Sequence, residues 1–194
     1  LPETSVAGHM LIVAVLTYML SLTIASCDKR KYNNFFAALF HDLPEVLTRD
    51  IISPVKSSIE GLDKIIKGIE EEEMERVIYP MLPEKWRKEI MYFTNDEFES
   101  KIIVDRKKQG EKFVKIADSE AINRQYNEDI YCPVDGELIE FCDKLSAYLE
   151  AYLSIKHGIT SRNLVEGHKH IYNRFKDAKI AGLDLSVLMD DFKL

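Results

Sequence analysis

Apolar residues recur at three- and four-residue spacing along most of the chain, the pattern of helices that bury one face. One long run covers 57–79, where apolar side chains from Leu62 to Ile78 fall on one side. Ser5 is suited to cap the first helix, which we expect to run to about Cys27. Further helices are predicted over 32–41, 83–93 and 135–157, from Ser161 onward, and from about Leu183, with Pro44 starting or kinking the segment after the second helix.

The region 98–131 breaks this pattern. Segments 101–104 and 112–116 are rich in strand-forming residues and flank a charged turn that contains Gly110. They predict a small β-hairpin inserted into a helical protein. No internal repeat and no Pro-, Gly- or Ser-rich linker divides the chain. We therefore expect one all-α domain over 1–194, a helical bundle, with an insertion of hairpin and loop at 98–131.

The composition is that of an ordinary folded protein. Of 194 residues, 46% are hydrophobic and 30% charged, which excludes collagen-like, low-complexity and disordered classes. A chain of this length buries enough surface to fold without disulfides or a structural metal. The net charge of −7 argues against a polynucleotide partner, because such binding needs a large basic surface. Cys27, Cys132 and Cys142 share no CxxC spacing, and we expect reduced thiols in a cytoplasmic protein.

The segment from Met10 to Cys27 carries no charged residue and is almost long enough to cross a membrane. It contains several hydroxyl-bearing side chains, and no basic cluster precedes it. We expect a buried core helix and no membrane partner, with a membrane span as the alternative interpretation. Because the chain begins at Leu1 without a methionine, we also expect it to be a piece, or the ordered part, of a slightly longer protein.

The stretch FFAALFHDLPEVLTRDIISPVK, residues 35–56, holds the candidate chemistry. His41 and Asp42 directly follow an apolar run, in which small alanines one turn earlier leave space beside them. Glu45 shares their face if the helical turn continues, and Asp50 follows one short loop later. An imidazole beside a carboxylate is a ligand pair for a divalent transition metal such as Mn, Co, Fe, Ni or Zn; it suits Ca less well and does not exclude Mg.

Two further candidates lie on other predicted helices. His9 is on an apolar face, and Asp143 is on a mid-helix apolar face where an unpaired carboxylate is costly to bury. With His41 and Asp42 they would supply two imidazoles and two carboxylates, leaving positions for water and substrate. Taken singly, His9 suits a core histidine, Asp42 a helix cap, Glu45 a first-turn carboxylate, and Asp143 a partner for a lysine. Their joint occurrence on three helices favours the metal site.

The order His…His-Asp…Asp resembles that of the HD-domain metal-dependent phosphohydrolases. HDLPEVLTRDIISPVK is similar to the HDxxEVLTGDxxTPVK stretch of the bacterial 5′-deoxynucleotidases of that superfamily, SVAGH to their first-histidine segment and FCDKLSAYLEA to their final helix. The resemblance implies an HD-domain-like helical fold. It implies that Glu45 orients or deprotonates the attacking water and that Asp50 assists at the leaving sugar oxygen. It also implies metal ligation by four residues, namely His9, His41, Asp42 and Asp143.

We therefore expect a metal-dependent phosphomonoester hydrolase that cleaves (deoxy)nucleoside 5′-monophosphates to nucleoside and phosphate, with Lys56 as a candidate phosphate contact. The Arg-Trp pair that helps these enzymes select deoxyribose has no counterpart here, so the sugar preference stays open. One alternative is an HD hydrolase of nucleoside triphosphates, tetraphosphate alarmones or cyclic dinucleotides. Another is a degenerate HD module with a regulatory or binding role. The resemblance and the aromatic C-terminal helices also favour a homodimer.

Overall fold

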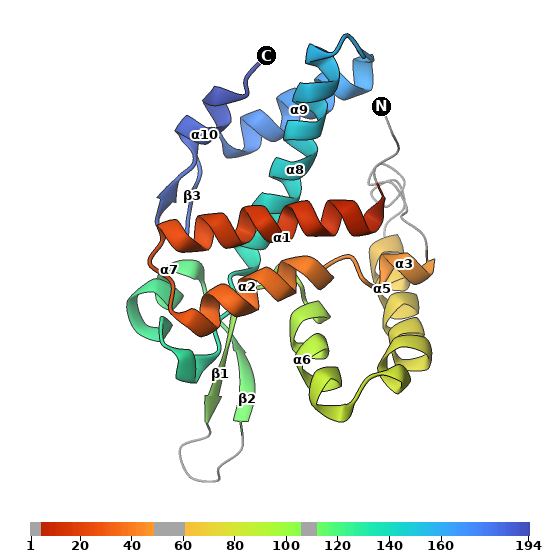
Figure 1. The fold of residues 1–194 in the computed structure, drawn as a ribbon, viewed down its shortest axis with the longest axis vertical. Helices are drawn as coiled ribbons and strands as arrows, with labels where there is room; N and C mark the ends of the chain where they lie inside the picture. Colours follow the sequence, from red (N-terminus) through yellow and green to blue (C-terminus); the bar gives the residue numbers. More distant parts are fainter. Residues whose placement is uncertain (1–4, 49–60, 106–111) are drawn as a thin grey trace.

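The computed structural model describes residues 5–48, 61–105 and 112–194. Over these ranges the protein is mainly helical, with two small two-stranded sheets, so the all-α fold class is confirmed. Figure 1 shows the arrangement of the elements. The main helices are α1 (Val6–Thr23), α2 (Asp28–Phe40), α3 (Glu45–Thr48), α5 (Leu62–Glu73), α6 (Glu84–Thr94), α8 (Gly136–Lys156), α9 (Arg162–Phe175) and α10 (Ser186–Asp191).

Helix α1 begins at the predicted residue. The hydroxyl of Ser5 accepts a hydrogen bond from the amide of Gly8 at 3.0 Å, which caps the first turn. The helix ends before the predicted Cys27, and just beyond its end Ala25 adopts a positive φ of 49°, a conformation that cannot continue a helix. Helix α2 then begins at Asp28, earlier than the predicted start at residue 32.

The core lies where α1, α2 and α8 pack against one another (Figure 1). Small side chains at the contact between α1 and α2 allow the two helix backbones to approach closely. These are Ala14 on α1 and Ala37 and Ala38 on α2, all almost completely buried. Helix α8 contributes the larger core side chains, among them Leu138, Ile139, Phe141, Cys142 and Leu145. The helices that carry His9 and Asp143, and the helix that His41 and Asp42 directly follow, therefore form the centre of the protein.

Only one face of α1 is buried, which corrects the prediction of a buried core helix. Val13, Ala14 and Thr17 face the interior and are inaccessible. The opposite face exposes large apolar side chains, and Met19 and Leu22 are more than half exposed. By length and composition, α1 is the one helix among the described residues that is apolar enough to cross a membrane, with a mean hydropathy of 1.8.

The predicted helix over 57–79 is present from Leu62 onward, and residues 57–60 lie outside the described ranges. After α5, the chain continues through one π-helical turn, Met74–Ile78, and one 3₁₀ turn, Tyr79–Met81. The predicted hairpin is also present. Strands β1 (Lys101–Asp105) and β2 (Lys112–Ile116) are antiparallel, and Ile103 pairs with Val114.

Two details of the predicted chain path are corrected. The rest of the insertion is not a simple loop, because it forms helical turns at α7 (Ser119–Ala121), Ile122–Tyr126 and Asp129–Tyr131. Near the C-terminus, strands β3 (Lys179–Ile180) and β4 (Leu183–Asp184) form a tiny hairpin. The terminal helix α10 therefore begins at Ser186 and not at Leu183.

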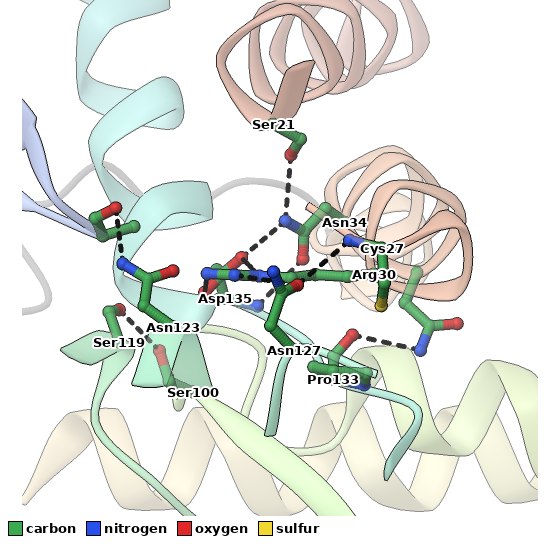
Figure 2. Close-up of polar contacts among 12 residues, drawn as sticks. Ser21, Cys27, Arg30, Asn34, Ser100, Ser119, Asn123, Asn127, Pro133 and Asp135 are labelled. Carbon is green, nitrogen blue, oxygen red and sulfur yellow. Dashed lines mark hydrogen bonds and ion pairs between the residues drawn. The ribbon is translucent and has the colours of Figure 1, made fainter. Parts of the chain in front are cut away.

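A buried polar network joins the start of α8 to α2 (Figure 2). The Arg30 guanidinium donates to both oxygens of Asp135, at 2.7 Å each, and both side chains are completely buried. Asn34 donates to the same carboxylate at 2.7 Å and to the Ser21 hydroxyl at 2.9 Å. Asn127 accepts from Arg30 at 3.3 Å and from the amide of Cys27. The network thus ties α1, α2, α8 and the insertion together.

Candidate metal centre

The four predicted ligands converge although they are far apart in the sequence. His9 lies in the second turn of α1, Asp143 in the middle of α8, and His41 and Asp42 in the turn that follows α2. His9 Nε2 is 3.1 Å from Asp143 Oδ1 and 3.6 Å from Asp42 Oδ2. His41 Nε2 is 3.1 Å from Asp42 Oδ1, and the two imidazole centroids are 5.6 Å apart.

The turn that presents His41 and Asp42 follows from the local sequence. Pro44 has no amide hydrogen to donate, so the helical hydrogen bonds of α2 cannot continue through it. The amide of Leu43 instead bonds to the carbonyl of Phe40 at 3.0 Å, and α3 then begins at Glu45. The carbonyl of Asp42 accepts from the Glu45 amide at 3.1 Å. The Asp42 carboxylate faces both imidazoles, with Oδ1 near His41 Nε2 and Oδ2 near His9 Nε2.

His41 has the hydrogen bonding expected of a metal ligand. Its Nδ1 donates to the carbonyl of Ala38 at 2.8 Å, which fixes the ring and leaves Nε2 as the ligand atom. Nε2 is buried and has no hydrogen-bond partner among the residues that the structure describes; the Asp42 oxygen is 3.1 Å away but does not form one. Burial lowers the pKa of His41, but the Asp42 and Asp143 carboxylates outweigh it and leave the pKa raised. A buried nitrogen among carboxylates therefore attracts a proton or another cation.

Asp143 stays ionised in the same place. Burial opposes its charge, but the hydrogen bond with His9 and the charge of Lys144 outweigh burial and hold its pKa well below the usual range. Lys144 Nζ is 2.8 Å from Asp143 Oδ2, so the lysine partner considered from the sequence exists alongside the contact with His9. Ser146 Oγ lies 3.4 Å from His9 Nδ1 and can accept its proton when Nε2 binds a cation.

The donor set fits a divalent ion. The ligand atoms of His9, His41 and Asp42 all lie within 4.8 Å of one another, and Asp143 adds a second carboxylate beside His9. Two imidazoles with two carboxylates suit a divalent transition metal, since neutral nitrogen and anionic oxygen donors together neutralise its charge. The main support for a bound ion is that the buried Nε2 of His41 lacks a hydrogen-bond partner among the described residues.

These residues lie in a pocket of about 600 Å³. Glu45 lines the pocket with the candidate ligands, and Tyr79, Thr94 and Asn95 also line it. Lys144 also lines it, a residue that the sequence analysis did not single out. In the sequence, the only indication that Lys144 would reach the site was its position directly after Asp143. Asp50 and Lys56, predicted to assist catalysis and to contact phosphate, lie outside the described residues.

Comparison with known families identifies the group to which this site belongs. The sequence model of the HD domain matches residues 1–172, which include all four candidate ligands. The chain belongs to the HD domain family. Neither the curated proteins nor the solved structures contain a significant match to it.

Membership of the family explains the convergence of side chains. HD domains bind divalent metals and are in general metal-dependent phosphohydrolases, and the histidine-aspartate cluster of this HD domain is compatible with both properties. The expected class of enzyme is therefore supported at the level of the family. The narrower similarity to 5′-deoxynucleotidases rests on the sequence motifs alone.

Proposed function

We propose that this HD domain hydrolyses (deoxy)nucleoside 5′-monophosphates to nucleoside and phosphate. The observation that carries the proposal is the convergence of His9, His41, Asp42 and Asp143 at one pocket that also contains Glu45. This supplies a metal-binding set and a neighbouring carboxylate, which are the groups that phosphoester hydrolysis by water requires.

The proposed roles follow from position. His9, His41, Asp42 and Asp143 would hold the ion, which when bound lowers the pKa of water and offsets charge on the phosphoryl oxygens. Glu45, three residues after Asp42 and lining the same pocket, would orient the attacking water and accept its proton.

Lys144 is the described cation best placed to meet a phosphoryl group. It already contacts a carboxylate oxygen of the candidate metal centre, at 2.8 Å, and only about a third of its side chain is exposed. We propose that it turns from Asp143 to the substrate phosphate when both a metal ion and substrate are bound. By resemblance, Asp50 would assist at the leaving sugar oxygen and Lys56 would be a further phosphate contact.

The charge of the pocket wall favours a substrate with a single phosphate. Glu70, Glu71, Glu97 and Glu150 also line the pocket, and Lys67, the other lysine of its lining, is paired with Asp96 at 2.8 Å. A polyphosphate chain extending along this wall would meet carboxylates. The volume of about 600 Å³ is within the range of small-ligand sites. Both features favour a mononucleotide over nucleotide tri- or tetraphosphates.

The test combines metal analysis with a substrate panel. Purified protein should contain, or gain on addition, about one divalent ion per chain, and should release phosphate from nucleoside monophosphates faster than from tri- or cyclic nucleotides. Asp42→Ala should abolish metal binding and phosphate release together. His170→Ala, on an exposed face of α9, is the matched control and should retain both.

Three results would contradict the proposal. Turnover retained by Asp42→Ala would reject the assigned site. Preferential hydrolysis of tri-, tetra- or cyclic phosphates would move the protein to another group of HD hydrolases. Metal binding without hydrolysis of any nucleotide would indicate a regulatory or binding module.

A further inference from the structure

We propose that Lys101 is a positioning residue of the candidate metal centre. Its ammonium group fixes the turn at residues 95–98, and this turn places Phe98 against His41. Lys101 is the first residue of β1 and is only 2% exposed. Such burial is rare for a lysine, because a buried charge is costly unless it is paired or hydrogen-bonded. This role rests on the proposed function only through metal binding by His41.

The ammonium group is held at the point where α6 ends and the turn begins. Lys101 Nζ donates to the carbonyl of Asn95 and, at 3.3 Å, to the carbonyl of Asp96. In the described part of the chain no backbone amide donates to the Asn95 carbonyl, so Lys101 satisfies an acceptor that the helix end leaves open. Nζ also lies over the Tyr92 ring, 5.3 Å from its centroid, where a cation is stabilised. An apolar side chain of the same length would make none of these polar contacts.

The group that holds the turn is charged at neutral pH. Burial lowers the pKa of Lys101 to about 8, and neighbouring carboxylates oppose that effect, so most of the side chain is protonated at about pH 7. Burial raises the pKa of Tyr92, which therefore stays neutral beside the ammonium group. The charged side chains that act on Lys101 are Asp96, Glu97, Glu99 and Lys67, of which Lys67 is paired with Asp96 at 2.8 Å.

The backbone of Lys101 is fixed on its other side. Its amide and carbonyl exchange hydrogen bonds of 2.9 Å with Val134, and the Tyr92 hydroxyl donates to the same carbonyl at 3.3 Å. Val134 is completely buried and immediately precedes Asp135, which forms the buried ion pair with Arg30. Lys101 therefore connects the turn to the rigid start of α8.

The turn needs such support and delivers it to the site. Asp96 has a φ of 49°, in the left-handed region that non-glycine residues seldom adopt. Beyond it, the Phe98 ring lies with its centroid 5.9 Å from that of the His41 ring. Asn95, Glu97 and Phe98 all line the pocket. Displacing the turn would therefore move a side chain that packs against a candidate ligand.

The affinity of the complete chain for Mn²⁺, measured by calorimetry at about pH 7, tests this role. K101M keeps the length of the side chain but removes the ammonium group. We expect it to weaken Mn²⁺ binding by about ten- to a hundredfold, the range for residues that orient metal ligands. K115M is the matched control, because Lys115 is exposed on β2 and lies over the Tyr126 ring, and it should bind Mn²⁺ like the wild type.

Two further measurements separate positioning from a general loss of stability. If Lys101 acts through Phe98, K101M should add less than about twofold to the loss of affinity that F98A causes. In the metal-free protein the Glu99 amide donates to the Asp96 carbonyl at 3.0 Å, and its hydrogen exchange should be faster in K101M while that of α9 is unchanged. If circular dichroism shows that K101M does not fold, K101Q, which retains a neutral donor, should show a smaller loss of affinity in the same direction.

The outcomes distinguish this role from the proposed function. Wild-type Mn²⁺ affinity in a folded K101M or K101Q, additive losses in the double variant, or unchanged exchange at Glu99 would overturn the role of Lys101 and leave the proposed function standing. A wild type that binds Mn²⁺ without hydrolysing any nucleotide contradicts the proposed function alone, and the affinities of the variants still decide the role of Lys101. A wild type that binds no divalent ion contradicts both.

Discussion

Replacing Arg30 by Met tests the buried network that joins α2 to α8 (Figure 2). Methionine keeps most of the aliphatic length but removes the guanidinium, which makes two 2.7 Å hydrogen bonds to Asp135. The Asp135 carboxylate would then remain completely buried with Asn34 as its remaining side-chain donor among the described residues. Removing one partner of a buried ion pair costs about 3–5 kcal/mol, because the other charge is left uncompensated.

That loss is large against a typical total stability of about 5–15 kcal/mol. A loss of about 4 kcal/mol raises the unfolding equilibrium constant roughly a thousandfold and lowers the melting temperature by about 10 °C for a chain of this size. Chemical unfolding followed by circular dichroism measures the change. Arg162→Met is the matched control, because Arg162 pairs with Glu166 on the exposed surface of α9, and its unfolding midpoint should not change.

The double variant Arg30→Met/Asp135→Leu separates the charge effect from the loss of packing. With both charges absent no buried carboxylate is left unpaired, so the combined loss should be smaller than the sum of the single losses by about 2 kcal/mol or more. A loss below about 1 kcal/mol in Arg30→Met, or strictly additive losses, would refute the reasoning. Because Asp135 begins the helix that carries Asp143, metal affinity of Arg30→Met should also fall.

Three further measurements examine the site and the core. The raised pKa of His41 means that protons compete with the metal ion for Nε2. Metal affinity measured by calorimetry should therefore fall as the pH falls through that pKa, and metal binding should release protons. Equal affinity from about pH 5.5 to 8.5 would contradict this. Gly136→Ala should destabilise the protein by at least about 2 kcal/mol, because the added Cβ would lie 2.3 Å from backbone atoms of Phe98 and Glu99, just before β1. Gly167→Ala is the control and should leave the stability unchanged, because its Cβ would meet nothing within 4 Å. Burial raises the pKa of Cys142 to about 12, so alkylation of the native protein should spare it and modify the partly exposed Cys132 first; equal rates would contradict the packing of α8.

Periodicity was sufficient to predict most helices, since one-sided burial leaves a repeating apolar pattern in the sequence, and the hairpin was predicted from strand-forming residues on both sides of a Gly-containing turn. It failed where burial was not the deciding factor. The break at Ala25 and the β3–β4 turn at Ala181 and Gly182 depend on positive φ angles that no apolar repeat encodes. The helical turns of the insertion are too short to show a period.

The sequence by itself determined the chemical types at the candidate centre, because a histidine or aspartate on an apolar face is costly unless it binds a partner. The tertiary structure alone decided that His9 and Asp143 meet His41 and Asp42, since the crossing of α1, α2 and α8 sets distances that spacing along the chain does not. It also decided that Lys144 reaches Asp143 and that α1 buries one face only, because both depend on which neighbouring helices cover a given side of the chain.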